Sequence, residues 1–131
     1  MMTILILFAV TAVVFLTLDA VMLTYVMKPL FTTHIGDMLA TDMRLGAAAM
    51  FYLAYVGGLI FLVSWPAMKT GAPVLLPAAV LGAMAYGTYE FTSYAIMKNW
   101  SPVMVATDVA WGTVLTAVSA WAGVTVARIW A

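Results

Sequence analysis

Residues 3–27 read TILILFAVTAVVFLTLDAVMLTYVM, an apolar run with a single charged side chain, Asp19. A helix needs about 20 predominantly apolar residues to cross the hydrocarbon core of a bilayer. The stretch therefore predicts a membrane-spanning helix, which we expect to end at Lys28 and Pro29. No basic segment precedes the run and no small-residue cleavage site follows it, so we interpret it as a retained helix rather than a cleaved signal peptide.

The composition requires a nonpolar environment around most of the chain. Of 131 residues, 66% are hydrophobic and 8% are charged, whereas a soluble domain carries about 25% charged residues. A domain of this size buries too small a fraction of its surface to hide so many apolar side chains from water. The net charge of zero offers no basic surface to nucleic acid, and a chain without cysteine forms no disulfide or thiolate metal site.

Three further stretches are long and apolar enough to cross a membrane. They cover residues 45–65, 74–97 and 102–127. Aromatic side chains of the kind that lie at membrane–water interfaces occur near the ends of the spans, at Tyr25, Trp65, Trp100 and Trp130. The connections at 66–73 and 98–101 are short, so consecutive helices should be antiparallel neighbours.

Capping and proline signals indicate where these helices begin and end. Thr41 and Asp42 are candidate N-caps for the second helix. Pro66 should end that helix, because the residue before a proline is disfavoured in the helical region. Ser101 and Pro102 form a favourable start for the fourth helix, since a side-chain cap is followed by a proline in the first turn.

These observations predict an all-α integral membrane fold in which residues 1–131 form a single transmembrane domain. The domain is an antiparallel bundle of four transmembrane helices. A short interfacial helix or loop joins the first two, because Phe31, Ile35, Met38 and Leu39 recur at helical spacing. We call the membrane side of the N-terminus side A and the opposite side, which holds the connection between the first two helices, side B.

Three acidic residues interrupt the apolar spans, and they fall at similar depth. At about 1.5 Å rise per residue, Asp19, Glu90 and Asp108 lie roughly 12, 10 and 9 Å inside the side B ends of their helices. The first and third helices run from side A to side B and the fourth runs back, so topology alone places the three carboxyl groups in the side B half. Acids at membrane depth usually face the protein interior and mark ion, proton or substrate sites.

Other polar side chains reach the same half of the predicted bundle. The second helix brings Tyr52 and Tyr55, and the fourth carries a stripe of small and polar residues that allows close helix approach, at Asp108, Gly112, Thr116, Ser119 and Gly123. We predict a binding cluster formed by Asp19, Tyr55, Tyr86, Tyr89, Glu90, Thr92, Asp108 and Trp111. A purely structural hydrogen-bonding network is the alternative explanation, and the sequence leaves both open.

The remaining polar residues predict no metal site and no cofactor. His34 is the only histidine, and a metal ion needs three or four ligands that no spacing here supplies. Lys28, Arg44 and Lys98 suit the membrane interface, where long basic side chains extend their charge into water. The sequence has no nucleotide-binding loop, nucleophile motif or zinc motif, so an enzymatic role has the least support.

Four blocks of the sequence carry a resemblance to a known family. They are FLTLDAVML (15–23), FYLAYVGGLIF (51–61), AYGTYEFTSYAIMKNW (85–100) and TDVAWGTVLTA (107–117). Together they resemble the bacterial membrane protein family called domain of unknown function 2177. The third block departs from the family pattern Tyr-Asp-Leu-Thr-Asn, with Glu90 for the aspartate and Ser93 for the asparagine. The resemblance implies a multi-pass protein of the bacterial inner membrane with four helices, and it implies no particular activity.

Three functions are compatible with this sequence. In the first, the cluster binds or translocates a proton, a cation or a polar headgroup, and the small chain acts as a homodimer. In the second, the chain is a non-catalytic accessory or assembly subunit of a larger membrane protein complex. In the third, it is a membrane-embedded enzyme that modifies lipids, with paired acids as acid and base. Membrane lipids are partners in all three.

Overall fold

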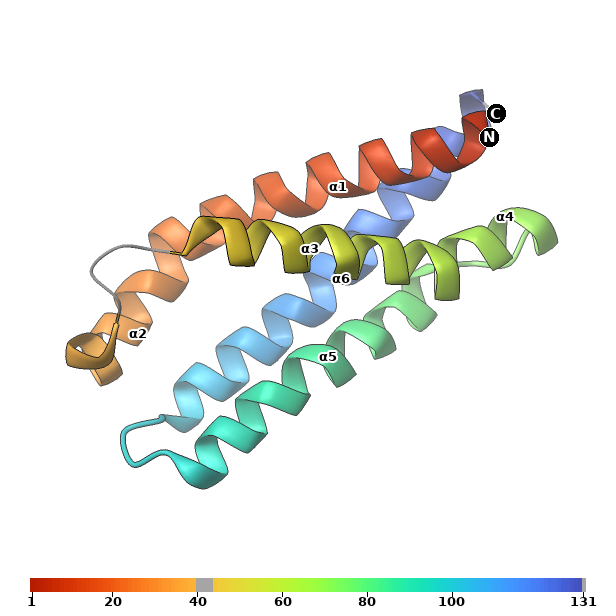
Figure 1. The fold of residues 1–131 in the computed structure, drawn as a ribbon. Coiled ribbons are helices and arrows are strands. Elements are labelled where there is room, and N and C mark those ends of the chain that lie inside the picture. Colours follow the sequence, from red (N-terminus) through yellow and green to blue (C-terminus); the bar gives the residue numbers. More distant parts are fainter. Residues whose placement is uncertain (40–43, 131) are drawn as a thin grey trace.

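The computed structural model describes residues 1–39 and 44–130, and within these ranges the chain forms helices and no strand. The predicted all-α fold class is confirmed. The proposed N-caps Thr41 and Asp42 lie outside the described residues. Both termini lie at one end of the bundle together with α4 (Trp65–Thr70), while α2 (Lys28–Ile35) and the turn before α6 (Pro102–Trp130) lie at the other end (Figure 1). These ends correspond to sides A and B.

The first helix is longer than the sequence indicates. From α1 (Met2–Met22) the chain continues through the π-helical turn η1 (Leu23–Met27) into α2 and the short 3-10 turn η2 (Gly36–Met38). The helix therefore does not end at Lys28 and Pro29 as expected. The predicted connecting helix follows the first span without a break. The whole stretch of 37 residues would measure roughly 55 Å, so α2 extends beyond a hydrocarbon core of about 30 Å.

The second helix also continues through a proline, and a π-helical turn again precedes that proline. The chain runs from α3 (Leu45–Leu59) through the π-helical turn η3 (Ile60–Ser64) into α4, past the expected end at Pro66. A proline ring clashes with the carbonyl four residues earlier in a regular α-helix. The wider π turn, in which the Trp65 amide bonds to the Ile60 carbonyl five residues back, relieves that clash. The helix finally ends at Gly71, whose φ of 75° is a left-handed conformation that glycine adopts readily.

The third and fourth helices agree closely with the sequence-based bounds. The third is α5 (Leu75–Ile96), and the fourth is α6. As predicted, the Ser101 hydroxyl caps α6, accepting a hydrogen bond from the Val103 amide at 3.1 Å. At the far end, Arg128 donates from Nη2 to the carbonyls of Ala67 at 3.1 Å and Ala72 at 3.0 Å, and so joins α6 to the end of α4.

The bundle is arranged around α6. Helices α5 and α1 pack along it, α3 packs on α1, and η3 reaches α6 near side A. Helices α3 and α5 diverge from the end that holds α4 toward side B (Figure 1). The short 66–73 connection therefore does not keep these consecutive helices together along their length.

Among the described residues, three helical stretches are long and apolar enough to cross a membrane, namely Met2–Met38, Leu45–Thr70 and Pro102–Trp130. Helix α5 is not among them because it is more polar, with three tyrosines and Glu90 in its sequence. Its 22 residues still measure roughly 33 Å, about the thickness of the hydrocarbon core. The structure is consistent with an all-α membrane bundle of three to four spanning helices.

Close helix approach depends on the small residues of α6, as the stripe predicts. Asp108, Gly112, Thr116, Ser119 and Gly123 are all buried. A Cβ added at Gly112 would lie 2.1 Å from the ring of Tyr86 on α5, and one at Gly123 would lie 2.1 Å from Thr11 Oγ1 on α1. These two glycines therefore set the distances of α5 and α1 from α6.

Candidate functional site

The three intramembrane carboxyl groups are buried in the side B half of the bundle. The exposed fraction is 8% for Asp19 on α1, 0% for Glu90 on α5 and 5% for Asp108 on α6. They come from three different helices, and the packing of these helices buries all three. Burying a charged or polar group without partners is costly, and each of the three has acquired a hydrogen-bond donor.

Each carboxyl group accepts a hydrogen bond from a neutral aromatic side chain. Trp111 donates from Nε1 to Asp19 Oδ1 at 3.1 Å, and Trp100 donates from Nε1 to Glu90 Oε1 at 2.8 Å. Tyr89 donates its hydroxyl to Asp108 Oδ2. These donors add no positive charge, so they hold the carboxyl groups in place without neutralising them.

Glu90 has a second oxygen that lacks such a donor. Its Oε2 is buried and has no hydrogen-bond partner among the described residues. The carboxyl group of Asp108 is a neighbour of the Glu90 carboxyl group, so a proton on either acid would allow a hydrogen bond between them. Without that proton the two groups would repel each other in an environment that screens charge weakly.

A cavity of about 280 Å³ opens beside the carboxyl groups. Its polar wall consists of Asp19, Asp108, Tyr52, Tyr86, Tyr89 and Lys28, and apolar side chains from η1, α2 and the segment after η2 complete it. We call this space the carboxyl cavity. Glu90 does not line this cavity; its carboxyl group accepts the hydrogen bond from Trp100 and is a neighbour of Asp108.

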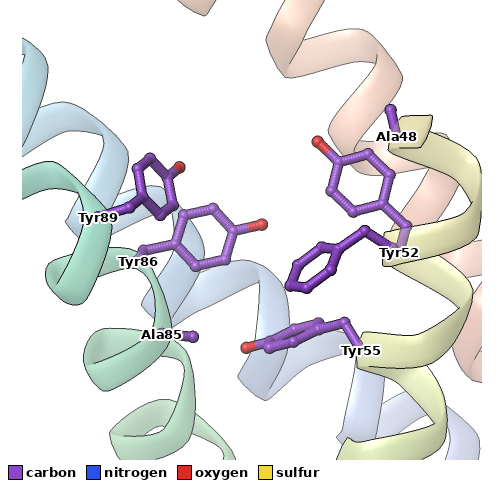
Figure 2. Close-up of a pocket in the computed structure, with 7 residues that line it drawn as sticks. Ala48, Tyr52, Tyr55, Ala85, Tyr86 and Tyr89 are labelled. Atoms are coloured by element: carbon purple, nitrogen blue, oxygen red, sulfur yellow. The ribbon is translucent and has the colours of Figure 1, made fainter. Parts of the chain in front are cut away.

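A second space of about 310 Å³ lies between α3 and α5, where the two helices diverge. It is lined by Ala48, Phe51, Tyr52, Tyr55, Ala85, Tyr86 and Tyr89, and we call it the tyrosine cleft. Tyr52 and Tyr55 face Tyr86 and Tyr89 across it (Figure 2). Three of its tyrosines, Tyr52, Tyr86 and Tyr89, also line the carboxyl cavity, so the two spaces adjoin.

The structure brings most of the predicted cluster together. Tyr86 lies on Gly112 and lines both spaces, while Tyr55 lines only the tyrosine cleft and has its hydroxyl 2.9 Å from Thr116 Oγ1. Thr92 is separate from the cluster: its side chain is exposed and donates to the Thr88 carbonyl of its own helix at 2.5 Å. Thr92 lies two residues after Glu90, which places it roughly 200° around the helix axis. Helical geometry therefore also puts the Thr92 side chain on the face of α5 opposite Glu90.

Three residues near the carboxyl groups were not in the predicted cluster. Tyr52 lines both spaces. It lies three residues before Tyr55 and so on the same helix face, and this spacing could have placed it in the cluster from the sequence. Trp100 was expected only as an interfacial anchor, yet its indole bonds Glu90 and its ring meets Phe31 edge-on, with centroids 5.4 Å apart. Lys28, also expected at the interface, is exposed but contributes to the wall of the carboxyl cavity.

The described residues do not assemble a metal centre. No group of three or more His, Cys, Asp or Glu side chains in residues 1–39 and 44–130 is placed to hold a metal ion. His34 belongs to α2, and its Nδ1 lies 3.0 Å from the Leu30 carbonyl of the same helix. The site is therefore a set of carboxyl groups, tyrosines and tryptophans.

Comparison with known proteins identifies the class of the chain. The sequence pattern of a family described as a predicted membrane protein, DUF2177, matches residues 4–125. No curated protein and no solved structure matches the chain. The family match agrees with the apolar helices, and the family description names no ligand.

Proposed function

Since the chain belongs to the predicted membrane protein family DUF2177, we propose that it is a multi-pass protein that binds an organic ammonium group in its carboxyl cavity. The observation that carries this proposal is the pairing of Asp19 and Asp108 with three tyrosines around one cavity at membrane depth. We place the protein in the bacterial inner membrane, as the sequence resemblance implies.

The charge of the cavity favours a cationic ligand. Asp19 and Asp108 come from α1 and α6 and are held by uncharged donors. The wall has one basic side chain, Lys28, which is exposed, whereas the two acids are buried. Opposite charges attract strongly where water is excluded, and a cation that enters between the two carboxyl groups would gain this attraction.

The aromatic lining favours an organic ammonium ion over a metal ion. The side chains of Tyr52, Tyr86 and Tyr89 line the cavity, and aromatic faces attract ammonium and quaternary ammonium groups. Hard metal ions instead require six or more oxygen ligands in a compact shell. A cavity of about 280 Å³ is far larger than the roughly 30 Å³ that a water molecule takes up in the liquid, so it suits a small organic cation.

Binding of choline tests this proposal, because choline has an isostere, dimethylbutanol, in which carbon replaces the charged nitrogen. Purified protein in lipid nanodiscs should bind choline at least about tenfold more tightly than dimethylbutanol, a difference typical of one cation–aromatic contact with desolvation. Asp19→Asn and Asp108→Asn should each remove most of that preference. Thr92→Val, outside the cluster, serves as the matched control. Equal affinity for the two compounds in the wild type would overturn the proposal.

The position of Glu90 favours a second role, the exchange of a proton for the bound cation. Glu90 is a neighbour of Asp108, and its Oε2 is buried without a partner among the described residues, so a cation that binds Asp108 would compete with any proton held between the two acids. We expect proton release when choline binds, measured with a pH dye in weak buffer. Glu90→Gln should abolish the release while choline still binds. Release that is unchanged in Glu90→Gln would exclude this role.

A further inference from the structure

We infer that the ligand is a cationic amphiphile whose hydrocarbon chain occupies the tyrosine cleft while its ammonium group occupies the carboxyl cavity. This inference rests on the proposed function and specifies the class of ligand. It follows from the adjacency of the two spaces, from their different chemistry, and from the depth at which the cleft opens.

The two spaces share a wall. Tyr52 on α3 and Tyr86 and Tyr89 on α5 line both of them, so these three side chains lie between one space and the other. Figure 2 shows the tyrosines of α3 and α5 on opposite sides of the cleft. A ligand that fills both spaces would therefore contact the same three rings with its two parts.

The walls of the two spaces differ in polarity, as the charged and apolar ends of an amphiphile do. The carboxyl cavity carries Asp19 and Asp108, whereas the cleft is lined by aromatic rings and by the methyl groups of Ala48 and Ala85. The charged end of the ligand is therefore complementary to the cavity, and a hydrocarbon chain is complementary to the cleft.

The cleft opens on the outer surface of the bundle at membrane depth. Phe51 and Tyr89 at its walls have exposed fractions of 64% and 46%. Ala48 and Tyr55 lie three and ten residues after the start of α3 at Leu45, roughly 5 and 15 Å along the helix. In a membrane-spanning bundle that part of the helix surface would adjoin lipid hydrocarbon, so a molecule that enters between α3 and α5 would come laterally from the bilayer.

Phenylalanine substitutions at the two alanines isolate the contribution of the cleft. Ala48 and Ala85 line the cleft but not the carboxyl cavity, so Ala48→Phe and Ala85→Phe would fill the tail site and leave the ammonium site unchanged. Ala49→Phe and Ala95→Phe, at exposed positions of the same helices, are the matched controls. The probes are choline and dodecyltrimethylammonium, with binding to protein-free nanodiscs subtracted.

We expect Ala48→Phe and Ala85→Phe to weaken dodecyltrimethylammonium binding at least about tenfold, as an overfilled apolar site does, and to leave choline binding unchanged. Both probes should weaken in Asp108→Asn, and dodecyl sulfate should not compete. If the phenylalanine variants bind dodecyltrimethylammonium as the controls do, while choline binding still requires Asp108, the inference fails and the proposed function stands. If dodecyl sulfate competes equally and neither probe depends on Asp108, both fail.

Discussion

Trp111 on α6 donates its indole N–H to Asp19 on α1 at 3.1 Å, and this bond joins residues that are 92 positions apart in the sequence. It fixes the carboxyl group of Asp19 at the wall of the carboxyl cavity. The contact also ties the first spanning helix to the central helix in the half of the bundle where α3 and α5 diverge. Loss of this bond should therefore affect both stability and the binding site.

We expect Trp111→Phe to reduce the free energy of unfolding by about 1–3 kcal/mol, the usual cost of leaving a buried acceptor without its donor. Phenylalanine keeps an aromatic ring in the core but lacks the N–H. Trp121→Phe, at an exposed position of the same helix, is the control. Unfolding in mixed micelles measures both variants, and equal stability of the two would show that the bond to Asp19 contributes nothing.

Glu90→Gln should stabilise the protein by about 1 kcal/mol. The amide oxygen can still accept from Trp100, while the amide nitrogen can donate to Asp108 and so replaces the unpartnered Oε2. Binding sites often keep polar groups at a cost in stability, so stabilisation would indicate that Glu90 is retained for function. Thermal unfolding in one nanodisc preparation measures the effect. A destabilised Glu90→Gln variant would instead assign Glu90 to a structural network.

Gly123→Ala should destabilise the bundle by about 1–3 kcal/mol, because an overfilled core is strained. The new Cβ would lie 2.1 Å from Thr11 Oγ1. Thr11→Ala removes that oxygen, which is buried and has no hydrogen-bond partner among the described residues. The double variant should therefore recover most of the lost stability.

Gly58→Ala is the control for this pair, because nothing lies within 4 Å of a Cβ added there. It should be neutral or stabilising by up to about 1 kcal/mol, the difference in helix propensity. If Thr11→Ala does not rescue Gly123→Ala, the packing of α1 on α6 is not limited by this contact.

Arg128→Gln should loosen the turn between α4 and α5 without changing the carboxyl cavity. Arg128 donates to the carbonyls of Ala67 and Ala72, at the opposite end of the bundle from the acids. We expect amide hydrogen exchange of Gly71, which bonds to the Ala67 carbonyl at 2.8 Å, to accelerate about tenfold. Lys69→Gln, whose ammonium lies over the Trp65 ring rather than on a carbonyl, is the control, and an equal acceleration there would contradict the prediction.

The sequence could not indicate that helices continue through Pro29 and Pro66. Proline normally ends a helix or bends it, and that expectation is sound for an isolated turn. In both places a π-helical turn ends two residues before the proline, at Met27 and at Ser64. Such turns carry no distinct local signature, because they use the same residues as α-helices and differ only in which carbonyl each amide selects.

The sequence by itself determined the helical class, the depth of Asp19, Glu90 and Asp108, and the small-residue face of α6. These features depend on apolar length, on the rise per residue and on helical periodicity, all of which are local properties. Only the tertiary structure decided that Trp111 bonds Asp19, that Trp100 bonds Glu90, and that α3 diverges from α5 to leave the tyrosine cleft. Those outcomes depend on the rotation and tilt of each packed helix. Contacts between side chains that are far apart in the chain determine that rotation and tilt.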